Sequence, residues 1–582
     1  MNRSLALLAG ATIISSAFAG KLSSELESAP AAKTVRVNVR YKKTPDASKH
    51  ARFAGKGGKL VASHDLVSTS TYEISAGALK EIAADPDIEL AAPDRVIKAS
   101  LDYTVETSGA NIAARYGLDG SGIAIAVIDS GIKDQKDFLN PATGKSRIVY
   151  SESFLDCSMN NSASQSVSAM STAVVDSTSV SSTSLAGCSA TTDAFGHGTH
   201  VAGTLAGNGG NSTGSAYSYT IRGIAPKADI VNLRVLDATG SGYDSSVIAA
   251  INRAIDLKSK YKIRILNLSL GRPVMESYNT DPLALAVRSA WEKGLIVVCA
   301  AGNQGRNNSA NNLGYGTISS PGNSPWAITV GAMKSMGTAN RSDDNITSFS
   351  SKGPTLIDHV AKPDLVAPGN KVDASSCSGC SLYNTYPVNR TLYETFTRSQ
   401  TGPSTTYFNM SGTSMATPVV SGAAALLLQA NYWLTPDQVK ARLMKTATKT
   451  FPSSSTTVDP VTGQAYVSYY NLFTVGAGYL DIWAALNSSE LVKGLALSPT
   501  AVLDKATGKV SITGTLNVVW GDTSTWGLNV VWGERVWING SNVVWGESGA
   551  PWMDPLNVVW GDNVVWGDNV VWGDNSDLKG EN

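Results

Sequence analysis

The most extended regular pattern in the chain begins near Gly122, where short apolar runs alternate with longer amphipathic ones. The apolar runs have the length of strands and occupy residues 123–128, 228–235, 263–270, 295–300 and 326–332. The longer runs have the spacing of helices and occupy residues 244–260, 281–294 and 416–430. Continuous apolar strands with interleaved helices predict a mostly parallel sheet that is covered by helices on both faces. The predicted fold class is therefore α/β, with three layers.

A different pattern precedes this region. Residues 34–41, TVRVNVRY, alternate like a half-buried strand, and residues 77–99 have the pattern of a short helix, a turn and another strand. Together they predict a small α+β unit ahead of the main body. Within the main body, segments 156–192 and 371–408 lack periodicity and are rich in Ser, Thr and Asn, which predicts surface loops inserted in the core.

The C-terminal region, residues 491–582, follows a third pattern. Copies of NVVWGD or NVVWGE begin at residues 517, 529, 542, 557, 563 and 569. Each copy pairs a β-forming VVW with Asn, Gly and acidic turn residues, which predicts short strands stacked as a repeat array. A self-packing β unit is favoured over a ligand-binding role, because tryptophan side chains pack in protein cores more often than they bind ligands. Adhesion to a surface or glycan, and dispensability, stay open.

The N-terminus predicts export. Arg3 precedes an apolar run over residues 5–18, and Ala17–Ala19 has the small-x-small form of a signal-peptidase site, so residues 1–19 are predicted to be a signal peptide. An uncleaved anchor or a buried apolar start is the alternative, although the run is short for a bilayer span. Lys plus Arg and Asp plus Glu each number 47, so charge suggests neither a nucleic-acid nor an anionic-membrane partner.

Export would place the five cysteines in an oxidising setting, where pairing is plausible. Cys157 and Cys188 bracket a Ser/Thr-rich loop and could close it. Cys377 and Cys380 lie in CSGC, for which a small strained ring and two free thiols are both open. Cys299 lies inside LIVVCAAG, which predicts packing as a small hydrophobe.

Three short strings carry the candidate chemistry. Asp129 ends an apolar run and would lie at the carboxyl edge of the sheet. His197 lies in DAFGHGTHVAGTLAG, where a loop turns into a helix, and Ser414 lies in SGTSMATP at the start of an apolar helix. In a nucleophilic triad a carboxylate orients an imidazole, which takes the hydroxyl proton. An ordinary Ser/Thr helix cap would explain only part of the last string.

DSG, HGTHVAG and GTSMATP, in this order and with matching interior strands, resemble the subtilisin-like serine proteases, the subtilase family. The resemblance covers roughly residues 34–490 and implies a subtilisin-like catalytic domain over residues 101–490. It implies a secreted serine endopeptidase that hydrolyses peptide bonds through an acyl-enzyme. Its catalytic residues would be Asp129, His197 and Ser414. Its oxyanion donors would be the side chain of Asn303 and the backbone N–H of Ser414.

The resemblance also assigns the front unit and the substrate-binding segments. Residues 20–100 would be an inhibitory propeptide whose last segment occupies the active site and is cut by the enzyme itself, near residues 99–103. Substrate backbone would be gripped as an extra strand, since glycines allow close approach. The gripping residues would be Gly240, Ser241 and Gly242 on one side and Ser269, Leu270 and Gly271 on the other. Ala300, Ala301 and Gly302 would form a small, uncharged floor, so apolar or aromatic side chains are expected before the scissile bond.

No organic cofactor is needed for this chemistry. The resemblance allows a structural calcium ion, but loop 207–215 has no acid and Asp137 is only a guess, so metal ligands stay unassigned. His200 has the spacing of a metal pair with His197, yet no ligand cluster follows, which favours a helix-packing histidine.

The expected partners are protein or peptide substrates and the chain's own propeptide as an intramolecular inhibitor. We expect a monomer with no nucleic-acid partner and no transmembrane segment once the signal is removed. The expected location is extracellular, either free or associated with the cell surface. The rival interpretation is a catalytically silent surface or adhesive protein that uses the repeat tail.

Overall fold

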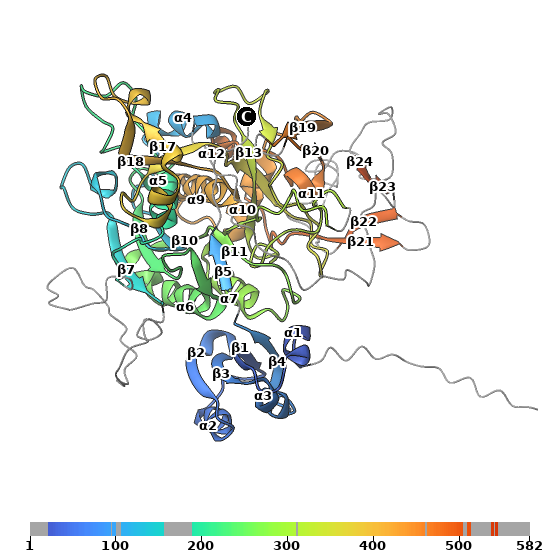
Figure 1. Ribbon diagram of the computed structural model, residues 1–582. Coiled ribbons are helices and arrows are strands. Elements are labelled where there is room, and N and C mark those ends of the chain that lie inside the picture. Colours follow the sequence, from blue (N-terminus) through green and yellow to red (C-terminus); the bar gives the residue numbers. More distant parts are fainter. Residues whose placement is uncertain are drawn as a thin grey trace, which may run out of the picture. The chain divides into compact units, whose positions relative to one another are not determined.

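The structure is a computed structural model. It describes residues 21–94, 96–99, 106–155, 189–309, 312–459, 463–489, 491–504, 509–513, 537–539 and 542–544. The chain divides into two compact units, Met1–Pro93 and Asp94–Asn582, and Figure 1 colours them along the sequence. The predicted signal peptide, and the first predicted insertion up to residue 188 with Cys157 and Cys188, lie outside the described residues.

The first unit is an antiparallel sheet with helices packed on it. Its strands lie in the order β2-β3-β1-β4 and are formed by Lys59–His64, Thr69–Ser75, Thr34–Tyr41 and Ile88–Pro93. The helices are α1 (Ser24–Ser28), α2 (Ala47–Gly55) and α3 (Ala76–Ile82). Val37 and Val39 of β1 pack in the core with Tyr72 and Phe53, so the alternation in TVRVNVRY predicted this strand correctly.

The second unit is built around an eight-stranded sheet in the order β14-β13-β12-β10-β6-β8-β7, with β15 also paired to β13. Its strands are β6 (Ala124–Asp129), β7 (Ile148–Ser153), β8 (Asp229–Arg234), β10 (Ile263–Leu268), β12 (Ile296–Ala300), β13 (Ile328–Lys334), β14 (Asn345–Ile346) and β15 (Leu365–Pro368). Every pairing in it is parallel except that of β13 with β14. The apolar runs predicted as strands correspond to β6, β8, β10, β12 and β13, which confirms the predicted sheet.

Helices cover both faces of this sheet. α5 (His197–Ala206) and α9 (Thr413–Ala430) pack on one face, and α6 (Asp244–Tyr261) and α7 (Pro282–Glu292) pack on the other (Figure 1). α9 is long and apolar enough to cross a membrane, but 89% of it is buried, so it is the core helix of this unit. The three-layer α/β class is therefore confirmed. Four more helices belong to the unit: α4 (Ala110–Arg115), α10 (Pro436–Thr446), α11 (Leu472–Val475) and α12 (Ile482–Asn487).

Segment 371–408 differs from the predicted surface loop. It forms most of a three-stranded antiparallel sheet, β16-β18-β17, made by Val372–Ser375, Pro403–Met410 and Arg390–Leu392, together with α8 (Ser381–Thr385). Phe396 and Tyr407 are fully buried in a cluster with Ile221. The prediction failed because these aromatic residues stand at irregular intervals among polar ones, and a distant part of the chain buries them.

The C-terminal part contains β19 (Ser454–Val458) and β20 (Ala465–Tyr469), followed by the antiparallel sheet β21-β22-β23-β24, made by Thr500–Asp504, Lys509–Thr513, Trp537–Asn539 and Asn542–Val544. β24 is the NVV of the repeat copy that begins at Asn542, so this copy forms a strand. The last three copies and the first two lie outside the described residues, and their stacking stays a prediction.

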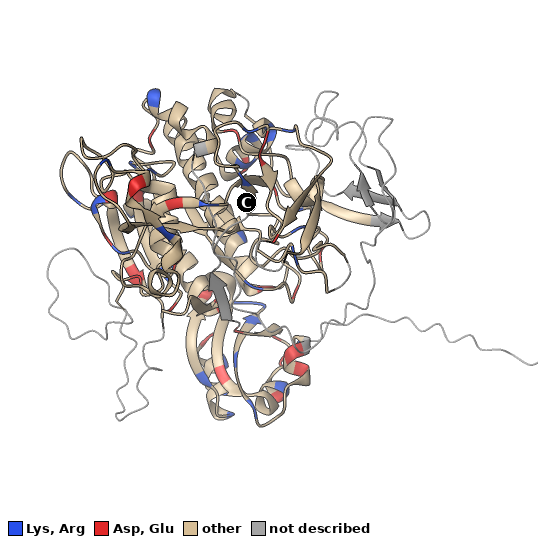
Figure 2. Cartoon of the chain, turned by 45° about the horizontal axis from the view of Figure 1, so that its top comes forward, with Lys and Arg blue, Asp and Glu red and all other residues tan. Residues whose placement is uncertain are grey.

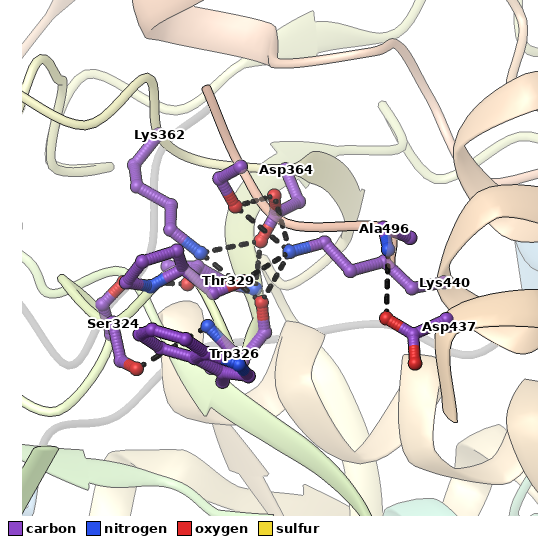
Figure 3. Close-up of polar contacts among 12 residues, drawn as sticks. Ser324, Trp326, Thr329, Lys362, Asp364, Asp437, Lys440 and Ala496 are labelled. Atoms are coloured by element: carbon purple, nitrogen blue, oxygen red, sulfur yellow. Dashed lines mark hydrogen bonds and ion pairs between the residues drawn. The ribbon is translucent and has the colours of Figure 1, made fainter. Parts of the chain in front are cut away.

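Charged residues of both signs are interspersed over the second unit (Figure 2), and some are buried. Lys362 and Lys440 share the carboxylate of Asp364 at 2.7 and 3.1 Å, and these side chains are at most 1% exposed (Figure 3). Ser498 donates a hydrogen bond to the same carboxylate at 2.6 Å. Burial lowers the pKa of Lys362 to about 7, against the opposing effect of Asp364. This cluster ties α10 and the segment after α12 to the sheet.

Candidate active site

The carboxyl end of β6 and the N-terminus of α5 bring Asp129 and His197 together. Nδ1 of His197 lies 2.6 Å from Oδ1 of Asp129, and both side chains are buried. An ionised carboxylate only accepts hydrogen bonds, so Nδ1 carries the proton and Nε2 is left as the basic nitrogen. The backbone N–H of Ser130 donates to the same carboxylate oxygen at 2.7 Å. This arrangement suits a general base.

A second buried carboxylate, that of Asp193, holds the loop ahead of His197. Its Oδ1 accepts hydrogen bonds from Ser130 Oγ at 2.9 Å and from Gly196 N at 2.6 Å. Its Oδ2 accepts from N and Oγ1 of Thr199 at 2.8 and 2.7 Å. Our reading of the sequence missed Asp193. Its position in DAFGHGTH, just before a helix N-terminus that needs an acceptor, is the signal that could have found it.

Ser414 is the second residue of α9, and it is buried. Its N–H belongs to the first helical turn, where backbone donors have no partner within the helix and the dipole favours negative charge. Its carbonyl oxygen accepts a hydrogen bond from Ser269 Oγ at 2.7 Å. His197 and Ser414 thus stand at the N-terminal ends of two helices, α5 and α9, that pack against each other.

Asn303 follows β12 and is fixed by the residue before Ser414. Its Oδ1 accepts hydrogen bonds from N and Oγ1 of Thr413, at 2.9 and 3.0 Å. Thr413 Oγ1 also accepts from Gly302 N at 3.0 Å. Because Oδ1 is held by Thr413, Nδ2 of Asn303 is the donor end of the carboxamide. It can serve as a hydrogen-bond donor to an oxyanion.

Two short strands flank this site, and an extended segment of the chain lies between them. β9 (Ser241–Tyr243) and β11 (Leu270–Gly271) both pair antiparallel with β5 (Val96–Ala99). Ala99 lies opposite Leu270, and Lys98 lies between Gly271 and Ser241. Figure 1 shows β5 beside β11. The segments predicted to grip substrate backbone therefore hold an extended segment in this structure.

The glycines of these segments are packed against the protein itself. A Cβ on Gly242 would lie 2.3 Å from the carbonyl oxygen of Val235, and one on Gly240 would lie 2.5 Å from the Phe195 ring. The predicted pocket floor is equally tight. Ala300 and Ala301 are buried, and Gly302 has a φ of +106° with no space for a Cβ. Larger residues at these positions would displace the neighbouring backbone or side chains.

A buried ion pair connects the two flanking strands. β9 leads directly into Asp244 and β11 leads directly into Arg272. Nε of Arg272 lies 3.0 and 2.9 Å from the carboxylate oxygens of Asp244, and its Nη2 lies 2.8 Å from Asp281. All three side chains are at most 1% exposed. The pair links the ends of β9 and β11, and sequence reasoning missed it.

His200 is buried within α5, where a helix-packing histidine was expected. Its Nε2 donates to the carbonyl oxygens of Phe408 and Val372, at 2.9 and 3.1 Å. Burial lowers the pKa of His200 to about 3, so its imidazole stays neutral. Its ring therefore fastens α5 to β16 and β18.

Asp137 was the guess for a calcium ligand, and its carboxylate accepts hydrogen bonds from three protein donors. Its Oδ1 accepts from Asn211 N at 2.8 Å and Tyr407 OH at 3.1 Å, and its Oδ2 accepts from Ser375 Oγ at 2.7 Å. These surroundings do not fit a calcium ion, which takes six to eight oxygen ligands. Within the described residues, no group of three or more His, Cys, Asp or Glu side chains could hold a metal ion.

Comparisons with known proteins agree on one family. The model of the Subtilase family matches residues 120–466. Serine protease AprX of Bacillus subtilis (strain 168) is 34% identical over 401 residues, covering 68% of this chain and 77% of that protein. Subtilisin E of the same organism is 30% identical over 417 residues, covering 70% and 84%.

A solved structure supports the fold. The structure of fervidolysin from Fervidobacterium pennivorans, described as a keratinolytic enzyme related to subtilisin, matches with a TM-score of 0.52 at 19% identity. The match covers 81% of this chain and 63%, less than two thirds, of that chain. At this identity the likeness shows the fold alone.

Proposed function

The chain belongs to the subtilase family and is a serine endopeptidase, and we propose that it is made as a secreted zymogen that cuts itself. Its substrates are proteins or peptides. His197 takes the proton of Ser414 Oγ as this oxygen attacks the peptide carbonyl, and Asp129 holds the imidazole in its working tautomer. Asn303 Nδ2 and the Ser414 N–H donate to the oxyanion. His197 then protonates the leaving amine, and water hydrolyses the acyl-enzyme.

The observation that carries the zymogen proposal is the pairing of β5 with both β9 and β11. A substrate would bind as an extra strand at this place. The segment before β5 is also anchored, because Asp94 accepts hydrogen bonds from N and Oγ of Ser245 at the start of α6, at 2.8 and 2.5 Å. These contacts support a role for residues 94–99 as the end of an inhibitory propeptide, residues 20–100. The cut would fall near residues 99–103.

Other parts of the proposal rest on sequence features. The signal-like residues 1–19 support export, and the curated relatives include subtilisins. The small, uncharged residues Ala300, Ala301 and Gly302 support a preference for apolar or aromatic residues before the scissile bond. The catalytic domain would span residues 101–490 and carry the repeat tail, 491–582, on a monomeric chain in the extracellular space.

The experiment compares the N-termini of the wild type and Ser414→Ala chains secreted by the same cells, by intact mass and N-terminal sequencing. We expect the wild type to begin near residue 100 and Ser414→Ala to retain residues 20–100. Ser411→Ala is the matched control, because it removes a buried hydroxyl three residues away, and it should still be processed. If the wild type and the Ser414→Ala chain both keep residues 20–100, and a fluorophosphonate probe labels neither of them, the protein is better interpreted as a catalytically silent surface protein.

A further inference from the structure

The CSGC sequence forms a tight turn at the start of α8. The N–H of Cys380 donates to the carbonyl oxygen of Cys377 at 3.1 Å. Gly379 has a φ of +93°, as the third position of a type II β-turn requires. The Cα atoms at the two ends of such a turn are less than about 7 Å apart, and a disulfide spans nearly the same range. Backbone geometry therefore permits a bond between the two sulfurs.

The two thiols belong to neighbouring residues at the ends of one turn. The Cys380 thiol, together with burial, raises the pKa of Cys377. Both residues are only 5% exposed. Two thiols at the ends of one tight turn need little backbone rearrangement to form a disulfide.

This turn is fastened to the loop that leads to His197. Cys377 Sγ donates to the carbonyl oxygen of Asp193 at 3.0 Å. The first two backbone N–H groups of α8 donate to the carbonyl oxygens of Ala194 and Phe195, at 2.9 and 3.0 Å. Three hydrogen bonds thus join the turn to the residues just before His197.

Cys380 also fills the space beside Gly196, the residue that directly precedes His197. Gly196 has a φ of +105°, and a Cβ built on it would lie 2.3 Å from Cys380 Sγ. The sulfur therefore packs directly against the backbone that sets the position of the imidazole. Whether Cys380 is a free thiol or part of a disulfide therefore affects the geometry of residues 193–196, the histidine loop.

We propose that Cys377 and Cys380 are a covalent cross-linking site, which closes into a disulfide in an oxidising compartment and locks the histidine loop. The oxidant is a disulfide compound such as oxidised glutathione. During folding, before the turn is buried, one cysteine thiolate attacks the oxidant's S–S bond, forming a mixed disulfide and releasing one thiol. The second cysteine thiolate then displaces the other thiol. One S–S bond forms and one breaks, and the two electrons and two protons end in the two released thiols.

The natural oxidising setting rests on the proposed export, whereas the cross-link itself does not. Oxidation removes the S–H of Cys377 and its hydrogen bond to Asp193, while the closed ring fixes the turn and so keeps the two N–H bonds of α8 to residues 194 and 195 in place. Because the ring spans only four residues, the disulfide constrains the unfolded chain modestly, and the expected gain in Tm is roughly 2–4 °C. Reduction should lower kcat more than it changes KM, since the loop positions the imidazole and not the substrate.

Pairing is tested on the Ser414→Ala chain, which lacks the proposed nucleophile. The chain is unfolded, refolded in oxidised glutathione, denatured with iodoacetamide and examined by peptide mass spectrometry. We expect the peptide with Cys377 and Cys380 to carry no alkyl group and to be two hydrogens lighter than the dithiol, and to carry two alkyl groups after dithiothreitol. Cys299, buried in β12 as predicted, is the internal control and should be alkylated in both samples. Two alkyl groups before reduction, or a bond to another cysteine, would overturn the proposal.

The effect on turnover is tested on the processed enzyme with a chromogenic peptide. Dithiothreitol should lower the kcat of the wild type on the order of three- to tenfold, with KM unchanged. The double variant Cys377→Ser/Cys380→Ser should have the low kcat in both conditions. Cys157→Ser/Cys188→Ser should respond as the wild type does. If dithiothreitol changes the kcat of Cys377→Ser/Cys380→Ser and of wild type equally, the locking role is contradicted. If no activity is found, the mass measurement still decides whether the two cysteines pair.

Discussion

The hydroxyl of Ser269 donates a hydrogen bond to the backbone carbonyl oxygen of Ser414 at 2.7 Å. In a regular helix this carbonyl would accept from the N–H four residues later, but that residue is Pro418, which has none. Ser269 supplies the partner that α9 lacks, and it does so from the segment between β10 and β11. The first turn of the helix that carries Ser414 is thereby fastened to a strand of the sheet.

Ser269→Ala should lower stability. It leaves a buried carbonyl without a partner, which costs about 1–3 kcal/mol. Pro418→Ala restores a backbone N–H at the right position, so the double variant should recover about 1 kcal/mol of that loss. Urea unfolding of the four chains, each in the Ser414→Ala background, gives the coupling as a double-mutant cycle. If Pro418→Ala changes the free energy of unfolding equally in the presence of Ser269 and of Ala at position 269, then Ser269 does not replace the missing N–H of Pro418.

Asn303→Leu should reduce kcat by about 10² to 10³ with little change in KM. The reason is that Asn303 Nδ2 is proposed to donate to the oxyanion, which forms during the reaction and is not present in the bound substrate. That magnitude is taken from subtilisin, a relative of this chain. Thr413→Val should have a smaller effect, on the order of tenfold, since it removes one of the two groups that hold Asn303 Oδ1. Thr417→Val, whose hydroxyl bonds to the carbonyl of Thr413 instead, is the control. A rise in KM at constant kcat for Asn303→Leu would assign it to substrate binding.

Arg272→Ala should destabilise the enzyme by about 3–5 kcal/mol, because Asp244 and Asp281 lose their buried cation. Lys227→Ala, which breaks an ion pair whose lysine is 56% exposed, should cost less than about 1 kcal/mol. Arg272 also links the ends of β9 and β11, so its loss should raise KM more for long peptides than for short ones. Urea unfolding and kinetics on a peptide length series test both effects. Equal changes in KM for long and short peptides would remove Arg272 from substrate positioning.

Lys362 should make stability increase with pH. Its pKa is about 7 in the folded chain and about 10.4 in the unfolded chain, so between these values the unfolded state binds one more proton. The free energy of unfolding should therefore rise by up to about 1.4 kcal/mol per pH unit over this window. Urea unfolding from about pH 7 to 10 should show a smaller slope for Lys362→Met than for wild type. Lys227→Met should keep the wild-type slope, and an unchanged slope in Lys362→Met would refute the assignment.

Patterns local in sequence predicted the elements and the placement of the best-marked groups. The apolar run at residues 123–128 predicted β6 and put Asp129 at its carboxyl end, because hydrophobic period and the first polar residue after a buried strand are both short-range features. The strings around His197 and Ser414 likewise marked the starts of α5 and α9.

Partnerships between distant segments needed the tertiary structure. In the sequence, nothing indicates that the side chain of Asp193 will bind Ser130. Arg272 follows a predicted strand, and nothing in the sequence indicates that it will pair with Asp244. Segment 371–408 shows the same limit, since Phe396 is buried by residues far away in the chain.

The sequence by itself determined the α/β class, the order of five strands of the main sheet and the helices between them, and the motifs that resemble the subtilase family. Only the tertiary structure decided which side chains hold those motifs in place: Ser269 for Ser414, Thr413 for Asn303, and Arg272 for the two flanking strands. The physical reason is that hydrophobic periodicity is set by neighbouring residues. A hydrogen bond or buried ion pair requires two groups within about 3 Å, and only the packing of separate elements brings them there.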